Sequence, residues 1–276
     1  MTASHALQDA SIALIGAGNM GFAMLEGWAE QGLAGDQVVI VEPNPSAQLQ
    51  SLCAARGFPL LAQGGAGARQ AVVLAIKPQM LEAGAQAAAP FVGPDSLTVS
   101  ILAGKRIADI GARLPGATAV VRAMPNTPAA IGRGMTGAFA NDATGANQIT
   151  LAHALLAAVG QVEWVESEAL IDSVTAVSGS GPAYVFYLVE CLAAAGVEAG
   201  LPAELSARLA RATIEGAGEL LHRQPDTGAD VLRQRVTSPG GTTAAALGEL
   251  MAADGLAPLM ARAVAAAKKR AGELSG

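Results

Sequence analysis

Short apolar runs alternate with longer amphipathic stretches through the first half of the chain. Each run is rich in valine, isoleucine, leucine or alanine, and they lie at residues 11–15, 38–43, 71–76, 97–102 and 118–124. Runs of this length and composition predict buried β-strands. The stretches between them, such as residues 45–56, predict helices. Strands that alternate with helices predict an α/β fold with a parallel sheet covered on both faces.

The pattern changes from about Ala143. Apolar residues then recur at intervals of three and four, as in ITLAHALLAAVG (149–160), and the β-like runs end after VEWVE (162–166). The remaining chain predicts helices punctuated by SGSGPA (178–183), GLPAE (200–204) and SPGG (238–241). We therefore expect two domains, a sheet-containing domain over residues 1–163 and an all-helical domain over residues 164–276.

Composition and charge exclude several classes of protein. With 51% hydrophobic and 14% charged residues, the chain is globular rather than disordered. A net charge of −6 argues against a nucleic-acid-binding surface. The best candidate for a membrane span, residues 172–190, is interrupted by SGSGP, so we expect no membrane segment. The first ten residues lack the pattern of a secretion signal, which favours the cytoplasm.

Metal-ligating residues are scattered along the chain. They are Cys53, Cys191, His5, His153 and His222, and no two of them have the spacing of a metal motif. No metal site is predicted.

A glycine-rich turn, GAGNMG at residues 16–21, follows the first predicted strand and begins a helix. In this position GxGxxG is the dinucleotide-binding fingerprint of a Rossmann-type domain. Gly16 permits the tight turn, Gly18 lets the backbone approach the pyrophosphate, and Gly21 lets helix and strand pack closely. The helix N-terminus offers free N–H groups to the phosphates, so we expect the cofactor to contact Gly16, Ala17, Gly18, Asn19, Met20 and Gly21.

Glu42 follows the second predicted strand, 21 residues after Gly21. A carboxylate there would accept hydrogen bonds from the adenosine ribose and would repel a 2′-phosphate, which favours NADH. The helix start that includes Asn44 could still supply donors to a phosphate, and Glu42 could instead point to solvent. NADPH and NADH both remain open.

Three further strand ends should border the cofactor, because ligands of doubly wound sheets lie at the carboxyl ends of the strands. Lys77 could contact a phosphate or be an ordinary exposed lysine. Asn126 could orient the nicotinamide amide or belong to a proline-bounded turn. The residues that we assign to the cofactor at these ends are Ala75, Ile76, Lys77, Pro78, Ala103, Gly104 and Asn126.

The stretch VTSPGGTT (236–243) contains no ionisable side chain, yet it has the chemistry of an anion site. A proline and two glycines before an Ala-rich helix make a nest of backbone N–H groups that can bind a carboxylate without Arg or Lys. The alternative is an ordinary helix start capped by Ser238 or Thr242.

No lysine occurs between Arg106 and Ala267. A dehydrogenase acting on a ketone or alcohol needs a group that exchanges the oxygen's proton, commonly His, Lys or Tyr. A C=N substrate eases this demand, because an imine can be protonated in water before it binds. The missing lysine also argues against a β-hydroxyacid dehydrogenase, which would need a catalytic lysine in the helical half.

Five motifs in order resemble those of one enzyme family. They are GAGNMG (16–21), AIKPQ (75–79), RAMPNTPA (122–129), VSGSGPAY (177–184) and VTSPGGTT (236–243). Together they resemble the pyrroline-5-carboxylate reductases, over nearly the entire chain from about Ile12 to Leu274. Many dehydrogenases share the first motif, whereas the last two are specific in combination.

The resemblance implies reduction of 1-pyrroline-5-carboxylate to L-proline by NADPH or NADH, the last step of proline biosynthesis. It also implies a Rossmann domain joined to an all-helical dimerisation domain, with dimers that often assemble further into a ring. By motif, Thr243 corresponds to a threonine near the substrate ring nitrogen, which makes it the candidate catalytic residue. The substrate carboxylate is assigned to Ser238, Gly240, Gly241 and Thr242.

Ser178 and Ser180 interrupt a helical pattern in SGSGP. They are candidate substrate contacts, and a close helix crossing at a dimer interface is the equal alternative. A non-catalytic NAD(P)-binding protein on the same scaffold would predict a degenerate second half, whereas VTSPGGTT is intact.

Overall fold

The computed structural model describes residues 7–275, which form two compact units. His5 and most of the segment considered as a secretion signal lie outside the described residues. The first unit runs to Gly179 and also includes the C-terminal segment from Ala267, and the second unit is Ser180–Ala266. The units divide later than the expected 163/164, because the segment after Trp164 packs against the last strands of the sheet.

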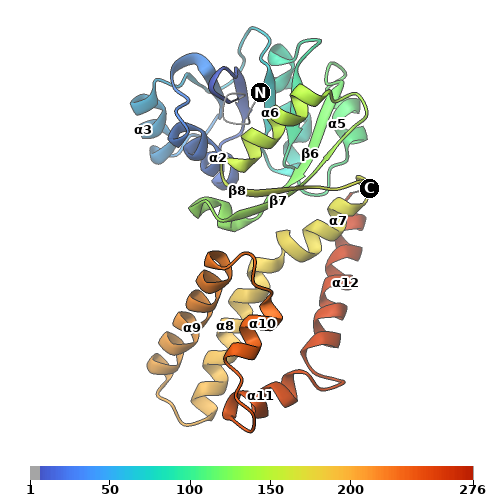
Figure 1. Cartoon of the computed structure of the whole chain (residues 1–276). Helices are drawn as coiled ribbons and strands as arrows, with labels where there is room; N and C mark the ends of the chain where they lie inside the picture. Colours follow the sequence, from blue (N-terminus) through green and yellow to red (C-terminus); the bar gives the residue numbers. More distant parts are fainter. Residues whose placement is uncertain (1–6, 276) are drawn as a thin grey trace. The chain divides into compact units, whose positions relative to one another are not determined.

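The first unit contains an eight-stranded sheet in the order β3-β2-β1-β4-β5-β6-β7-β8 (Figure 1). Strands β1 to β6 are parallel, as expected, but β7 runs antiparallel to β6. The bounds are β1 Ile12–Ile15, β2 Val38–Val41, β3 Leu60–Leu61, β4 Ala71–Leu74, β5 Leu97–Ser100, β6 Ala119–Met124, β7 Gly134–Ala140 and β8 Gly160–Trp164.

The sequence pattern does not predict β7, because its sequence GMTGAFA is neither a continuous apolar run nor an alternating one. Its glycines serve packing. A Cβ at Gly134 would lie 2.7 Å from the carbonyl oxygen of Val159, and one at Gly137 would lie 2.6 Å from the side chain of Val174. Strand β7 therefore lets neighbouring segments approach its backbone.

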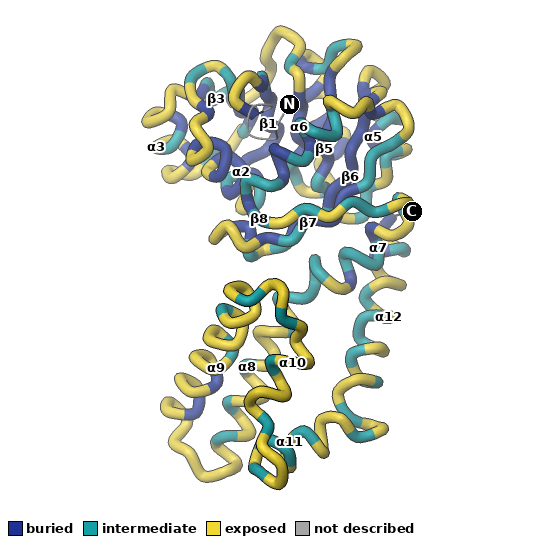
Figure 2. The backbone as a smooth tube through the Cα atoms, in the orientation of Figure 1, coloured by how far each residue is buried: buried dark blue, intermediate teal, exposed yellow. Residues whose placement is uncertain are grey.

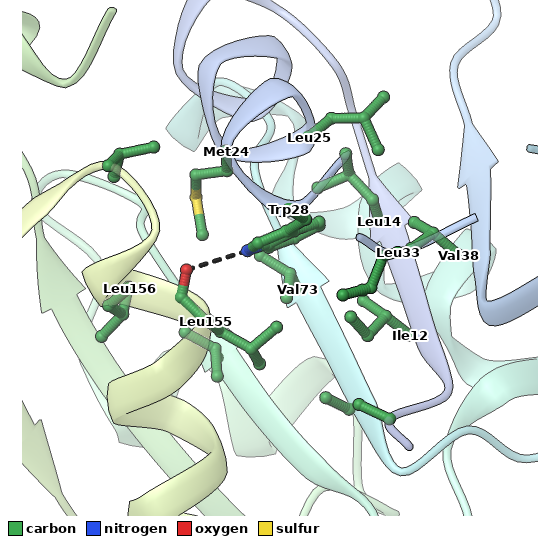
Figure 3. Packing of buried hydrophobic residues seen from close by; sticks show 14 of the residues in the cluster. Ile12, Leu14, Met24, Leu25, Trp28, Leu33, Val38, Val73, Leu155 and Leu156 are labelled. Atoms are coloured by element: carbon green, nitrogen blue, oxygen red, sulfur yellow. Dashed lines mark hydrogen bonds between the residues drawn. The ribbon is translucent and has the colours of Figure 1, made fainter. Parts of the chain in front are cut away.

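Helices cover both faces of the sheet. One face carries α2 (Asn19–Glu30), α3 (Ala47–Arg56) and α6 (Ala146–Ala157), and the other carries α4 (Leu81–Ala88) and α5 (Ile107–Arg113). Alternate residues of each central strand face the two layers, as Ile12 and Ala13 illustrate. Within the first layer the buried Trp28 donates a 2.9 Å hydrogen bond from Nε1 to the carbonyl oxygen of Leu155, which ties α2 to α6 (Figure 3).

The second unit is helical. It contains α8 (Gly181–Glu198), α9 (Ala203–Arg223), α10 (Ala229–Arg235), α11 (Thr242–Leu250) and the first part of α12 (Leu256–Leu274). Helices α8 and α9 pack together, and Ser206 donates a 2.6 Å hydrogen bond to the carbonyl oxygen of Ala193 across this contact. Few described residues of the unit are buried, and none of α8 is (Figure 2).

The SGSGP stretch interrupts the regular α-helix, as expected. Helix α7 (Leu170–Val174) is followed by a π-helical turn, η5 (Thr175–Gly179), and Ser180 then precedes the first turn of α8. Pro182 lies in the first turn of α8, where a proline lacks no needed N–H donor. One helical stretch, Leu170–Glu198 (29 residues), contains an 18-residue window with a mean hydropathy of 1.3 and is long and apolar enough to cross a membrane by length and composition alone, so the expectation of no membrane segment stays a prediction.

Candidate active site

The glycine turn after β1 has the packing that its fingerprint predicts. Gly16 is buried with φ of 86°, and a Cβ there would lie 2.8 Å from the carbonyl oxygen of Ala75. A Cβ at Gly21 would lie 2.6 Å from the carbonyl oxygen of Gly16, so glycine at position 21 lets the start of α2 approach the turn after β1. A Cβ at Gly18, by contrast, would have nothing within 4 Å. Space is therefore left open at the middle glycine, as backbone approach by a pyrophosphate requires.

The N-terminus of α2 is suited to an anion. Gly18 is the N-cap residue and makes no side-chain cap, and the first turn contains no acidic residue. Gly18 and Asn19 are exposed, whereas Ala17 is buried. The first-turn N–H groups of a helix have no intrahelical partners and lie at the positive end of its dipole. The predicted residues 16–21 are thus gathered at the carboxyl end of β1, and their contact with a phosphate stays a prediction.

Glu42 points to the backbone at the end of β2 rather than to solvent. Its Oε2 accepts a 2.9 Å hydrogen bond from the N–H of Ala17, and its Oε1 accepts a 3.0 Å bond from the N–H of Asn44. One carboxylate therefore joins the glycine turn to the β2–α3 turn. Ser46 caps α3 by accepting a 3.2 Å bond from the N–H of Leu49. The N–H groups of Asn44 and Leu49 at this helix start are therefore already engaged in hydrogen bonds within the protein.

The strand ends assigned to the cofactor are brought together on the sheet. Ile15 pairs with Val41 on one side and with Leu74 on the other, and Leu74 pairs with Ser100. The order reverses between β1 and β4, and this switch point is where doubly wound sheets bind ligands. The segment from Ala75 to Pro78 follows β4 at this point, and Lys77 is exposed before the short helix η2 (Pro78–Met80).

Gly104, after β5, has a packing role of its own. Its φ is 66°, and a Cβ there would lie 2.9 Å from the carbonyl oxygen of Leu274, near the end of α12. The neighbouring Ala103 is exposed. Glycine is required here by the contact with the C-terminal segment, so the nicotinamide contact assigned to Ala103 and Gly104 stays a prediction.

Asn126 connects three segments of the first unit. Its Nδ2 donates to the carbonyl oxygen and to the Oγ of Ser178, at 3.2 and 3.3 Å, and its Oδ1 accepts a 2.8 Å bond from the N–H of Met135. Ser178 in turn donates from Oγ to the carbonyl oxygen of Met135 at 3.4 Å. Both predicted site residues thus hold the π-helical turn against β6 and β7, and their ligand contacts remain predictions.

In the second unit, the VTSPGGTT stretch forms the N-terminus of α11. Gly240 has φ of 69°, and the N–H of Gly241 donates a 3.1 Å bond to the carbonyl oxygen of Ser238. Gly241 is the N-cap of α11 and makes no side-chain cap, although Ser238 and Thr242 had offered one as the alternative. Ser238, Gly240 and Thr242 are exposed, so this helix N-terminus lies open at the surface of the unit.

The hydroxyl groups of the second unit that are candidates for the substrate site differ in setting. Thr243 is half-buried in the first turn of α11, whereas Thr242 is exposed. Ser180 is the N-cap of α8 and makes no side-chain cap. The pKa of Tyr187, the tyrosine farther along α8, is raised, chiefly by its hydrogen bond with Cys191.

Arg122 is a buried residue of β6 that the sequence pattern does not single out beyond its place in RAMPNTPA. Its Nη1 lies 3.3 Å from Oε1 of Glu168, and its Nη2 lies 3.5 Å from Oδ1 of Asp172 and from Oγ of Ser275. The partners are 46, 50 and 153 residues away in sequence. Only the unusual arginine within an apolar strand could have indicated this cluster.

A hollow of about 550 Å³ lies between α2 and α3 and is lined by Phe22, Glu26, Ala47, Gln48, Ser51 and Leu52. None of these is among the predicted site residues, although Phe22 follows Gly21 directly and Ala47 begins α3.

Two family models match the chain. One, described as pyrroline-5-carboxylate reductase dimerisation, matches residues 168–274, and the other, described as NADP oxidoreductase coenzyme F420-dependent, matches residues 11–104. The models thus cover the helical region and the glycine-turn region separately.

Relatives cover nearly the whole chain. The pyrroline-5-carboxylate reductase of Pseudomonas aeruginosa is 40% identical over 266 residues, which is 96% of each chain. That of Synechocystis is 39% identical over 95% of this chain and 97% of its own. The solved structure of a pyrroline-5-carboxylate reductase from Coxiella burnetii is 34% identical, covers 97% of this chain and 99% of its own, and superposes with a TM-score of 0.88.

Proposed function

Because this chain belongs to the pyrroline-5-carboxylate reductase family, we propose that it reduces 1-pyrroline-5-carboxylate to L-proline with NADH or NADPH, the last step of proline biosynthesis. The observation that carries the proposal is a pair of helix N-termini, α2 and α11, each begun by an uncapped glycine. One suits the phosphates of a dinucleotide and the other suits the carboxylate of a small acid. Neither needs a lysine or arginine.

The residues of the first unit fit a nicotinamide dinucleotide, which supplies the hydride when bound. Gly18 leaves open the space that the pyrophosphate requires, and the α2 N-terminus offers backbone donors to it. The strand ends at Ala75–Pro78, Ala103–Gly104 and Asn126 are proposed to border the rest of the cofactor. Family membership and the fold support NAD(P)H as the cofactor class.

Glu42 supports a preference for NADH within that class. Both of its oxygens are held by backbone N–H groups, which fixes the carboxylate beside the glycine turn. Each oxygen keeps a lone pair for a ribose hydroxyl, whereas a 2′-phosphate would meet a negative charge that cannot turn away. We propose that Glu42 selects against NADPH.

The substrate site is proposed at the α11 tip. Backbone N–H groups of Gly240, Gly241 and Thr242, with the hydroxyl of Ser238, would bind the substrate carboxylate. Thr243 would lie beside the ring nitrogen and hold the protonated imine in place. The iminium carbon accepts the hydride, the C=N π electrons pass to nitrogen as a lone pair, and the product is a secondary amine. No side chain has to transfer a proton in this step.

The helical unit forms the oligomer, as the matching dimerisation model indicates. Large apolar side chains of α8 are exposed in the single chain, including Phe186 at 62% and Tyr187 at 65%. We propose that a second copy of the chain covers this face. Residues 164–276 would then form a domain that both binds the substrate and forms the dimer. Dimers could assemble further into a ring. Covering by a second copy also explains a helix of membrane length in a soluble enzyme, which we place in the cytoplasm.

The proposal is tested by following the oxidation of NADH and of NADPH by the purified protein with racemic pyrroline-5-carboxylate, with L-proline identified as the product. Turnover with at least one cofactor is expected. A folded protein that binds cofactor but turns over neither would instead support the non-catalytic alternative. Sedimentation across a concentration series distinguishes monomer, dimer and ring.

A further inference from the structure

Arg122 lies almost completely buried in the first unit, with 3% of its side chain exposed. Burying a guanidinium is costly unless carboxylates compensate it. Here Glu168 and Asp172 do so at 3.3 and 3.5 Å, but Nε of Arg122 has no hydrogen-bond partner among the described residues. Long contacts and one unmet donor are not what a purely stabilising ion cluster would require, so a different role must account for the residue.

The cluster connects four segments of the first unit. Glu168 Oε1 also accepts a 2.8 Å bond from the N–H of Ile107, at the start of α5. Asp172 Oδ1 accepts a 3.3 Å bond from Oγ of Ser275, which also donates to the carbonyl oxygen of Ala271. Strand β6, α5, α7 and the last turn of α12 are thereby held around a single guanidinium.

Two of these segments are the connections to the helical unit. The chain leaves the first unit through α7 and η5, which end at Gly179, and returns to it at Ala267 in α12. The far end of the departing connection is held by Asn126, four residues after Arg122, through Ser178. Residues of one strand and of the loop after it therefore fix the departing connection at both ends and the returning connection at its last turn.

We infer that Arg122 is a positioning residue for the proposed reaction. It holds, on the sheet that carries the glycine turn, both of the segments that connect the first unit to residues 180–266. The inference rests on the proposed function, in which cofactor and substrate are bound by different units. Hydride transfer is sensitive to misplacement of about 1 Å, so a looser connection should slow it without weakening cofactor binding.

The first test is Arg122→Lys, which keeps the charge but replaces a fork that reaches two carboxylates with a single ammonium. We expect kcat/KM for pyrroline-5-carboxylate to fall about tenfold or more, with the Kd of NADH in the absence of substrate within about twofold of the wild type. The matched control is Arg113→Lys, which alters the exposed pair of Arg113 and Glu82 at 3.6 Å and should change neither value.

Asp172→Asn provides a second variant in case Arg122→Lys does not fold. It keeps the shape of the side chain and weakens the pairing with Arg122. We expect it to lower kcat/KM by a smaller factor than Arg122→Lys does. Unchanged kcat/KM in whichever variants fold, or an equal loss of cofactor affinity, would overturn the inference.

Amide hydrogen exchange separates this inference from the proposed function. In Arg122→Lys, exchange should accelerate in residues 168–179 and 267–275 and stay unchanged in β1, β2 and β4. Hydrogen exchange does not depend on turnover. It therefore still tests whether Arg122 holds the two connecting segments if the wild type proves inactive with pyrroline-5-carboxylate. Unchanged exchange in both connecting segments would contradict the role assigned to Arg122.

Discussion

The two glycine-led helix N-termini, of α2 and α11, differ in what holds them. Both lack a side-chain cap and both lack an acidic residue in the first turn. At the α2 tip the N-cap Gly18 is open, but the flanking Gly16 and Gly21 are buried and a Cβ on either would meet backbone; at the α11 tip Gly240 is open, but a Cβ at the N-cap Gly241 would lie 2.5 Å from Oγ of Ser238. Contacts with the neighbouring strand end thus specify the α2 tip, while contacts within its own loop specify the α11 tip.

The largest effects are expected from two alanine substitutions at the α2 tip, one of which should lower stability and the other cofactor affinity. Gly16→Ala forces a Cβ against the backbone at Ala75 and demands φ of 86°, so it should destabilise the first unit by about 3 kcal/mol or more. Gly18→Ala meets no atom and should fold normally, but its methyl group occupies the proposed pyrophosphate space and should weaken NADH binding at least tenfold.

Denaturant unfolding and calorimetric NADH titration measure the two effects. A stable Gly16→Ala variant would remove the packing argument. A Gly18→Ala variant with wild-type affinity would move the pyrophosphate away from this turn.

At the α11 tip the corresponding effect should be on catalysis rather than on stability. Thr243→Val keeps the size of the side chain and removes its hydroxyl, so kcat should fall about 10²-fold with little change in the Kd of NADH. Steady-state kinetics and cofactor titration measure this. Thr213→Val, on the exposed surface of α9, is the control, and equal activity in both variants would exclude Thr243 from the reaction.

A smaller and selective effect is expected beside the α2 tip. Glu42→Ser removes the carboxylate held by Ala17 and Asn44, so the ratio of kcat/KM for NADPH to that for NADH should rise about tenfold. Binding of ADP-ribose and of its 2′-phosphate, measured by titration, gives the same comparison without turnover. An unchanged ratio, matching that of the control Glu26→Gln, would show that Glu42 does not face the ribose.

The smallest effect is expected on stability, from a substitution within α11 after its N-terminal turn. Gly248 lies within α11 and has open space around it, so Gly248→Ala should stabilise the protein by about 0.5–1 kcal/mol through helix propensity. Thermal unfolding measures it, and kinetic constants should not change. A destabilised variant would mean that a second copy of the chain packs closely against this glycine.

The sheet was accessible from the sequence where each strand is a continuous apolar run. Strands β1, β2, β4, β5 and β6 lie within the predicted runs, since strands covered on both faces are mostly apolar. Strand β7 escapes this rule, because its glycines accommodate Val174 and the backbone at Val159 rather than filling space themselves. SGSGP is accessible from the sequence as well, because its small residues and proline indicate an interruption, and a π-helical turn precedes α8 there.

The candidate site divides in the same way. GAGNMG and VTSPGGTT are contiguous, so their chemistry can be inferred from adjacent residues, and both form helix N-termini. The hydrogen bond between Glu42 and Ala17 and the contacts of the Arg122 cluster join residues that are distant in sequence. Arg122 and Ser275 are 153 residues apart. No local pattern determines those contacts, because they are set by how the sheet and its connections pack.

The first unit is discontinuous in sequence, with Ser180–Ala266 inserted before its final segment. During vectorial synthesis the ribosome therefore makes the sheet first, the helical insertion next and the segment that contacts Gly104 and Arg122 last. Until that segment emerges, Asp172 lacks its Ser275 partner. The contacts of residues 267–275 with the sheet can therefore form only after residues 180–266 have been synthesised.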